Sequence, residues 1–203
     1  MKRFWLAFLI ALTVSVTLAG CGSVKYPALY TLNVPPPPDP PAKEGVRAAV
    51  AIREFRSPAY LRQGPIVYRP SAEQVGLYEY HRWAVDPRET VTNAVAERLR
   101  ASGSFALVKM YDGRSDVDYL LTGQLEKLEE VDYEGGVRVE VALSAYMRDL
   151  QTGATVWTNS VCETGVVSQR SVPAVVAEMS RTLDRAIEKL VVPSPAAVVA
   201  APR

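Results

Sequence analysis

The sequence predicts an α+β domain in which an antiparallel or mixed β-sheet carries two amphipathic helices packed on one face. Apolar residues recur at helical spacing in two segments, one after Asp86 and one after Ser171. Residues 117–167 instead alternate apolar and polar side chains, with glycine-containing turns between the runs. Strands joined by such short turns lack the crossovers of a fully parallel sheet, which argues against a Rossmann-type architecture.

Length and composition exclude several classes of protein. A chain of 203 residues suits one ordinary domain, and a hydrophobic share of 48% is typical of a packed core rather than of disorder. The net charge of +1 gives no sign of the basic face that binds nucleic acid, so we expect no nucleic-acid partner. Two cysteines and one histidine are too few for a four-ligand zinc site, and we expect neither a metal nor a cofactor.

The first 21 residues have the pattern of a bacterial lipoprotein signal. Lys2 and Arg3 precede an apolar run of about fifteen residues, which is short for a membrane span. The run ends in the lipobox Leu18-Ala19-Gly20-Cys21. We therefore expect cleavage between Gly20 and Cys21, which removes residues 1–20, and transfer of a diacylglycerol group to the Cys21 thiol. The alternative is a transmembrane anchor with Cys21 at its end.

The residue after Cys21 indicates the destination of the mature protein. Gly22 stands at this position rather than Asp, which in Gram-negative lipoproteins resembles the default signal for transfer to the outer membrane. We expect a protein that its acyl chains, palmitate among them, anchor to the periplasmic face of the outer membrane. Residues 21–28 form its tether, which spans about 25 Å when extended.

The first half of the domain, which we place at residues 29–191, contains four expected strands. They cover residues 29–32, 46–55, 66–68 and 75–83, and a stiff polyproline spacer at 34–41 separates the first two. Alternation divides the fourth strand into two faces, with Val75, Leu77 and Trp83 on one and Tyr78, Tyr80 and Arg82 on the other.

The first helix has clear end signals. Asp86 is expected at the N-cap, with Pro87 in the first turn and Glu89 completing a capping box. Gly103 is expected to end the helix. The apolar stripe that would face the sheet consists of Val91, Ala94, Val95 and Leu99.

The second half of the domain reads as a meander followed by a helix. Strands are expected at 105–109, 117–125, 137–147 and 154–167, with turns at Gly135-Gly136 and at 149–153. Ser171 is expected to cap the second helix, and Pro193 to end it. Its apolar stripe consists of Val172, Val176, Met179, Leu183, Ile187 and Leu190. Residues 192–203 are expected to form a disordered tail.

Three groups of residues could carry chemistry, and for each we favour a structural role. His81 is the only histidine and the natural general base of a hydrolase, but no nucleophile stands at a suitable spacing. Cys162 is left without a partner once Cys21 is acylated, and we interpret it as a small apolar strand residue rather than a nucleophile or an intermolecular bridge. The acidic cluster Glu126, Glu129, Glu130, Asp132 and Glu134 runs into a turn and is interpreted as a solvated hairpin end rather than a calcium site.

Aromatic and arginine residues alternate between positions 56 and 83. This mixture is typical of interaction surfaces, but we favour ordinary core and rim packing of the strands and keep an interaction surface as the alternative. The candidate partner-binding residues are Tyr78, Tyr80, Arg82 and Trp83.

The order of these features resembles a known family. The lipobox is followed by Leu29-Tyr30-Thr31-Leu32, Pro58-Ala59-Tyr60-Leu61, Ile66-Val67-Tyr68 and Arg82-Trp83-Ala84, and then by the first helix. Over residues 29–191 this order resembles the ABC-type transport auxiliary lipoproteins, the group that includes PqiC-like proteins.

The resemblance implies a role that is not enzymatic. Such lipoproteins are outer-membrane components that work with Mce-type substrate-binding proteins and an inner-membrane ABC permease to move lipids or other hydrophobic molecules. It therefore implies an auxiliary or docking subunit, and docking onto a multimeric transporter would favour a homo-oligomer. The alternatives are an envelope assembly lipoprotein that binds other protein partners and, with His81 as base, an envelope hydrolase.

Overall fold

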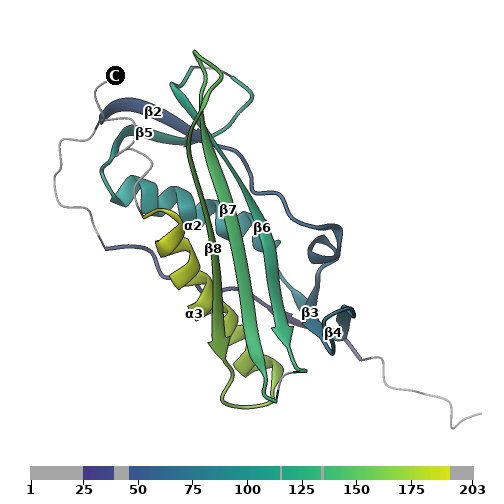
Figure 1. The fold of residues 1–203 in the computed structure, drawn as a ribbon. Helices are drawn as coiled ribbons and strands as arrows, with labels where there is room; N and C mark the ends of the chain where they lie inside the picture. Colours follow the sequence, from purple (N-terminus) through teal and green to yellow (C-terminus); the bar gives the residue numbers. More distant parts are fainter. Residues whose placement is uncertain (1–24, 39–45, 115, 134, 193–203) are drawn as a thin grey trace, which may run out of the picture.

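The computed structural model of the chain describes residues 25–38, 46–114, 116–133 and 135–192 (Figure 1). The predicted signal peptide, Cys21 and the predicted tail beyond residue 192 lie outside the described residues. The elements in chain order are β1 (Ala28–Tyr30), β2 (Val46–Ile52), the 3-10 helix η1 (Ala59–Arg62), β3 (Pro65–Arg69), β4 (Gly76–Trp83), α2 (Pro87–Ala101), β5 (Phe105–Met110), β6 (Tyr119–Val131), β7 (Arg138–Asp149), β8 (Thr155–Val166) and α3 (Val172–Leu190).

The strands form one mixed sheet, which confirms the predicted fold class. The order is β1-β4-β3-β6-β2-β5, and β7 pairs with β6 while β8 pairs with β7. The meander of β6, β7 and β8 is antiparallel, as the alternation predicts. The pairs β1–β4, β2–β5, β2–β6 and β3–β6 are parallel.

Strand β6 connects the two ends of the molecule. Its first residues, 119–121, pair with β2, and its last, 130–131, pair with β3. At about 3.3 Å per residue these two contacts are roughly 33 Å apart. In Figure 1, β2 and β5 accordingly lie at the upper end of the long strands, and β3 and β4 lie near the lower end.

Helix α2 has the predicted ends and the predicted buried face. The Asp86 side chain accepts a hydrogen bond from the Arg88 N–H, and its carboxylate also pairs with the Arg88 guanidinium, 2.7 Å away. This guanidinium, by its hydrogen bond, lowers the pKa of the Asp86 carboxyl. Gly103, at a φ of 60°, follows the last turn. The residues of the predicted stripe are all buried: Val91, Ala94, Val95 and Leu99.

Helix α3 packs its apolar stripe against β7 and β8 on the same side of the sheet as α2, as predicted. Five of the six residues of the stripe are buried, and Val172, the first, is partly buried. Arg98 of α2 and Asp184 of α3 form an ion pair that joins the two helices. Neither of the helices described in the structure has the length and apolarity that crossing a bilayer would require.

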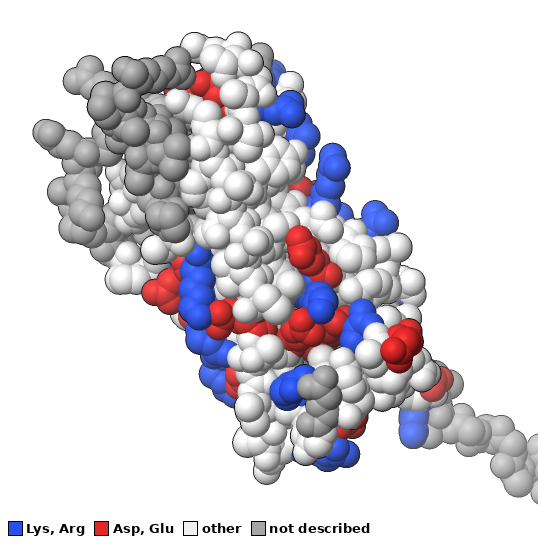
Figure 2. All heavy atoms as spheres, viewed as in Figure 1, with Lys and Arg blue, Asp and Glu red and all other residues white. Residues whose placement is uncertain are grey.

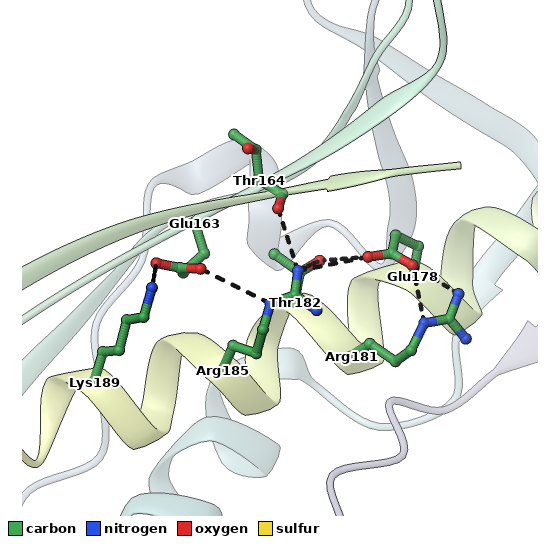
Figure 3. Close-up of polar contacts among 7 residues, drawn as sticks. All are labelled: Glu163, Thr164, Glu178, Arg181, Thr182, Arg185 and Lys189. Atoms are coloured by element: carbon green, nitrogen blue, oxygen red, sulfur yellow. Dashed lines mark hydrogen bonds and ion pairs between the residues drawn. The ribbon is translucent and has the colours of Figure 1, made fainter. Parts of the chain in front are cut away.

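A polar seam also attaches α3 to β8 (Figure 3). From the helix, Lys189 donates to the Glu163 carboxylate over 2.6 Å, and Arg185 donates to the Thr164 carbonyl over 3.2 Å. Glu178 accepts from Arg181 and from the Thr182 hydroxyl. Glu178 and Thr182 occupy the space that a Cβ on Gly165 of β8 would need. The seam was missed in the sequence because these residues belong to the helix face that its pattern assigns to solvent.

Candidate docking surface

Strand β4 carries the four residues that the sequence selects for partner binding, and its pairing is irregular. Arg82 of β4 pairs with Pro65 of β3, and Leu77 of β4 pairs with Val67 of β3. An advance of five residues along β4 therefore corresponds to only two residues along β3. A strand with extra residues bends and loses strict alternation. The two predicted faces are therefore wrong, because Leu77 is 37% exposed whereas Trp83 is only 8% exposed.

Tyr78 points into the protein and ties β4 to β6. Its hydroxyl donates a hydrogen bond to Oε2 of Glu130 over 2.8 Å. Its ring centroid lies 4.9 Å from that of Tyr68 on the neighbouring β3. Burial, followed by the hydrogen bond to Glu130, raises the pKa of the Tyr78 hydroxyl. Tyr78 therefore supports the surface from beneath.

Tyr80 is the most exposed of the four candidates. Its side chain is 39% exposed, and the Lys25 ammonium lies 5.7 Å from the centre of its ring, within the range of a cation–π contact. Lys25 leads directly into β1, where Ala28 pairs with His81 of β4. Tyr80 therefore lies where residues 25–30 join the domain.

Arg82 is fixed at the surface by the loop that precedes β3. Its Nη2 donates to the Gln63 carbonyl over 2.9 Å. A Cβ at the next residue, Gly64, would lie 2.8 Å from the same nitrogen, and Gly64 has a φ of 94°. Glycine at position 64 thus permits both the positive φ of the turn and the close approach of the Arg82 guanidinium.

Trp83 belongs to the core, where it packs in the main hydrophobic cluster. Of the four candidates, the structure thus brings Tyr80 and Arg82 to the surface and places Tyr78 and Trp83 beneath it. Leu29, missed in the sequence, is 65% exposed and pairs with Arg82, so the two side chains point to the same face. Together Leu29, Tyr80 and Arg82 form what we call the β1–β4 surface. The sequence signal for it was the position of Leu29 beside the tether.

His81 is held between aromatic rings on β1 and β4. Its Nδ1 lies 3.0 Å from the Tyr30 hydroxyl. The Tyr78 ring meets it edge-on, with 5.6 Å between centroids. Both partners are phenolic rings that position the imidazole between β1 and the inner side of β4.

The prediction that the acidic cluster is a solvated hairpin end is wrong for two of its members, and another, Glu134, lies outside the described residues. Glu129 is 0% exposed and Glu130 is 6% exposed. The reason is the length of β6, which continues to Val131 instead of ending near residue 125, so both glutamates pair with neighbouring strands. Oε1 of Glu129 lies 2.5 Å from Nε of Arg69, while its Oε2 has no hydrogen-bond partner among the described residues.

Charged pairs continue from Glu129 across the sheet. Lys127 of β6 donates to Glu140 of β7 over 2.7 Å, and the Cys162 thiol of β8 lies 3.5 Å from the same carboxylate. Cys162 is exposed, but partial burial of its thiol, followed by the hydrogen bond to Glu140, raises the thiol pKa and disfavours the thiolate. Figure 2 shows acidic and basic atoms side by side in a band across the molecule, below a mainly uncharged area. Among the described residues no group of acidic, histidine and cysteine side chains has the arrangement of a metal site.

Comparisons with known proteins agree with this architecture. A model of the family described as "ABC-type transport auxiliary lipoprotein component" matches residues 30–191. The crystal structure of protein XCC0632 from Xanthomonas campestris has a TM-score of 0.69 at 18% identity, and the alignment covers 81% of this chain and 92% of that one.

A second solved structure, the hypothetical protein CT253 from Chlamydia trachomatis, has a TM-score of 0.51 at 11% identity. That alignment covers 77% of this chain and all of the other. At such identities the likeness shows a shared fold. No curated protein matches the sequence.

Proposed function

The chain belongs to the ABC-type transport auxiliary lipoprotein family, and we propose that it is a non-catalytic docking subunit of an Mce-type transport system for lipids or other hydrophobic molecules. The observation that carries this proposal is the family match over residues 30–191, which includes nearly every strand and both helices. The partners would be an Mce-type substrate-binding protein and an inner-membrane ABC permease. ATP hydrolysis would belong to another subunit, because the sequence contains no phosphate-binding loop.

The proposal includes a lipid anchor at Cys21 on the periplasmic face of the outer membrane. Four steps of chain separate Cys21 from Lys25, which is a reach of at most about 14 Å. The β1–β4 surface, which Lys25 contacts through Tyr80, would therefore stay close to the anchor. A partner that docks there would be held next to the outer membrane.

The β1–β4 surface has the composition of a docking site. An exposed tyrosine and an arginine held in a fixed position are the residue types that contribute most to protein interfaces. Tyr80 and Arg82 supply them, and the exposed Leu29, which pairs with Arg82, adds apolar area beside them. Tyr78 and Trp83 stabilise this surface from inside and are not themselves contacts in the proposal.

Co-purification with an Mce-type partner tests the docking role. Full-length protein in detergent should recover the Mce-type protein of the same cells, and Tyr80→Ala with Arg82→Ala should reduce recovery at least fivefold. Tyr133→Ala is the matched control, because Tyr133 is also 39% exposed but follows β6 at the hairpin to β7. If wild type recovers none of the Mce-type protein, the docking role is wrong.

A further inference from the structure

A groove on the helix-free face of the sheet carries three arginines that form no ion pair in the described part of the chain. One cavity of about 190 Å³ is lined by Arg53, Tyr111, Tyr146 and Arg148, among others. A second, of about 100 Å³, is lined by residues that include Arg56 and Ser144. Thr122 and Tyr146 line both cavities, so the two are parts of one groove, which we call the arginine groove.

The strand register explains why these side chains meet. Leu120, Thr122 and Gln124 of β6 pair with Arg148, Tyr146 and Ser144 of β7, and side chains of paired residues point to the same face. The apolar partners between them, such as Leu121 opposite Met147, are buried on the helix-covered face. Arg53 follows the end of β2, and Arg56 bridges to Gln124 in parallel. The groove is therefore built on the central strands of the sheet.

No carboxylate of the described residues pairs with an arginine of the groove, and Arg53 is held in place by an aromatic ring. The Arg53 guanidinium lies 4.9 Å from the centre of the Tyr111 ring, a cation–π contact that fixes its position and leaves its charge. Arg69, Arg88, Arg98, Arg181 and Arg185, by contrast, all pair with a carboxylate. Ser144, which lines the second cavity, donates a hydrogen bond to the Glu126 carboxylate.

We propose that the arginine groove binds a carboxylate-bearing extended segment of a partner protein. Arginine binds carboxylates in a bidentate manner, and Arg53 and Arg148 line one cavity in which an aspartate or glutamate side chain would meet both. Tyr111 and Tyr146 supply aromatic area, and Thr122, Gln124 and Ser144 supply groups that pair with a peptide backbone. Both volumes suit single side chains and are too small for acyl chains.

The position of the groove favours a protein partner over the anchoring bilayer. The groove lies along the first half of β6, whereas the β1–β4 surface joins the sheet through β3 at the last two residues of β6. Gln124, the groove residue of β6 closest to β3, is six residues from Glu130, the first residue of β6 that pairs with β3, so this pairing lies about 20 Å further along the strand. The inference stands without the Mce-type system, since it rests on the charge and shape of the groove.

Fluorescence anisotropy with a defined acidic peptide tests the proposal. The full-length protein in a non-ionic detergent is titrated into fluorescein-labelled (Gly-Glu)4 amide, with (Gly-Gln)4 amide as the neutral probe. We expect binding of the acidic peptide alone, and a dissociation constant raised at least tenfold in Arg53→Glu/Arg148→Glu. Arg62→Glu, which reverses an exposed charge on η1, should change it less than twofold.

Two further measurements make each outcome decisive. Tyr146→Ala keeps every charge and should weaken binding at least threefold, and urea unfolding should show that the variants remain as stable as wild type. N-acetylglutamate should displace the peptide at lower concentration than glycerol 3-phosphate. The proposal is overturned if Arg62→Glu loses as much affinity for the acidic peptide as Arg53→Glu/Arg148→Glu, or if the wild-type protein does not bind the acidic peptide. Stronger displacement by glycerol 3-phosphate would instead assign the groove to a phosphate headgroup and would also overturn it.

Discussion

Nε of Arg69 on β3 lies 2.5 Å from Oε1 of Glu129 on β6, and Glu129 is entirely buried. The nearby hydroxyl of Tyr60 has its pKa raised, first by burial and then by the charge of Glu129. The pair lies where β3 and β6 run parallel, so it joins the end of the sheet that holds β1 and β4 to the central meander.

Removing Arg69 should therefore be costly. In Arg69→Ala the Glu129 carboxylate loses its partner in the interior, and we expect the free energy of unfolding to fall by about 3 kcal/mol. Arg170→Ala is the control, because its pair with Asp132 is similarly short but Arg170 is 73% exposed, so the loss should stay below about 1 kcal/mol. Urea unfolding measures both. Equal losses in the two variants would contradict the role given to the buried pair.

Glu130 should make the stability of the protein dependent on pH. Burial raises the pKa of its carboxyl, so the folded state holds this proton more tightly than the unfolded state does. The resulting contribution is complete below the unfolded pKa and is lost as the pH rises through the folded pKa.

Glu130→Gln should remove the loss of stability that accompanies ionisation of Glu130 while keeping a hydrogen-bond acceptor for the Tyr78 hydroxyl. The free energy of unfolding of the variant minus that of wild type should therefore increase between pH 4 and pH 7. Carboxyls whose pKa is lowered, such as those of Asp86 and Glu140, act equally in both proteins and cancel in the difference. A difference that is constant with pH, measured by urea unfolding, would contradict the prediction.

Gly123 should not tolerate a side chain. A Cβ at this position of β6 would overlap the ring of Phe55, which is 1% exposed and hydrogen-bonded through its N–H to Thr92 of α2. We expect Gly123→Ala to lower the free energy of unfolding by about 2 kcal/mol through overpacking. Gly136→Ala should be neutral or slightly stabilising, because among the described residues, its chain neighbours aside, no atom lies within 4 Å of a Cβ at this position. Thermal unfolding of both variants tests the close approach of Gly123 to the Phe55 ring. Identical unfolding midpoints in the two variants would contradict it.

Cys162 should react slowly with alkylating reagents. Its pKa is raised by burial and by the hydrogen bond to Glu140, so little thiolate is present at neutral pH. Iodoacetamide at pH 7.5 should therefore modify it more slowly than a free cysteine, and Glu140→Gln should increase the rate. Faster alkylation in wild type than in the variant would show that Glu140 does not suppress the thiolate.

The sequence predicted the elements whose signals are local. Asp86, Pro87 and Gly103 define the ends of α2 by their own backbone chemistry, and the alternation in 137–147 defines β7. The pairing of β3 with β6 was not predictable, because it depends on contacts between residues about sixty positions apart. For the same reason the burial of Glu129 and Glu130 was missed, since their charge favours solvent until both neighbouring strands are in place.

The candidate site was predicted only in part. The strand that carries Tyr80 and Arg82 was placed correctly, but regular alternation cannot account for extra residues opposite β3. That irregularity exposes Leu77 and buries Trp83. The arginine groove was missed altogether, because Arg53, Arg56 and Arg148 meet only through the register of β2, β6 and β7 and share no sequence pattern.

Lipid labelling tests the central claim, that an acylated cysteine anchors this docking subunit at the outer membrane. Cells that express wild-type protein or Cys21→Ser are grown with radiolabelled palmitate, and their membranes are separated on a density gradient. The account predicts labelled wild-type protein in the outer-membrane fraction and no label in Cys21→Ser. Unlabelled wild-type protein, or wild-type protein recovered in the soluble fraction, would contradict it.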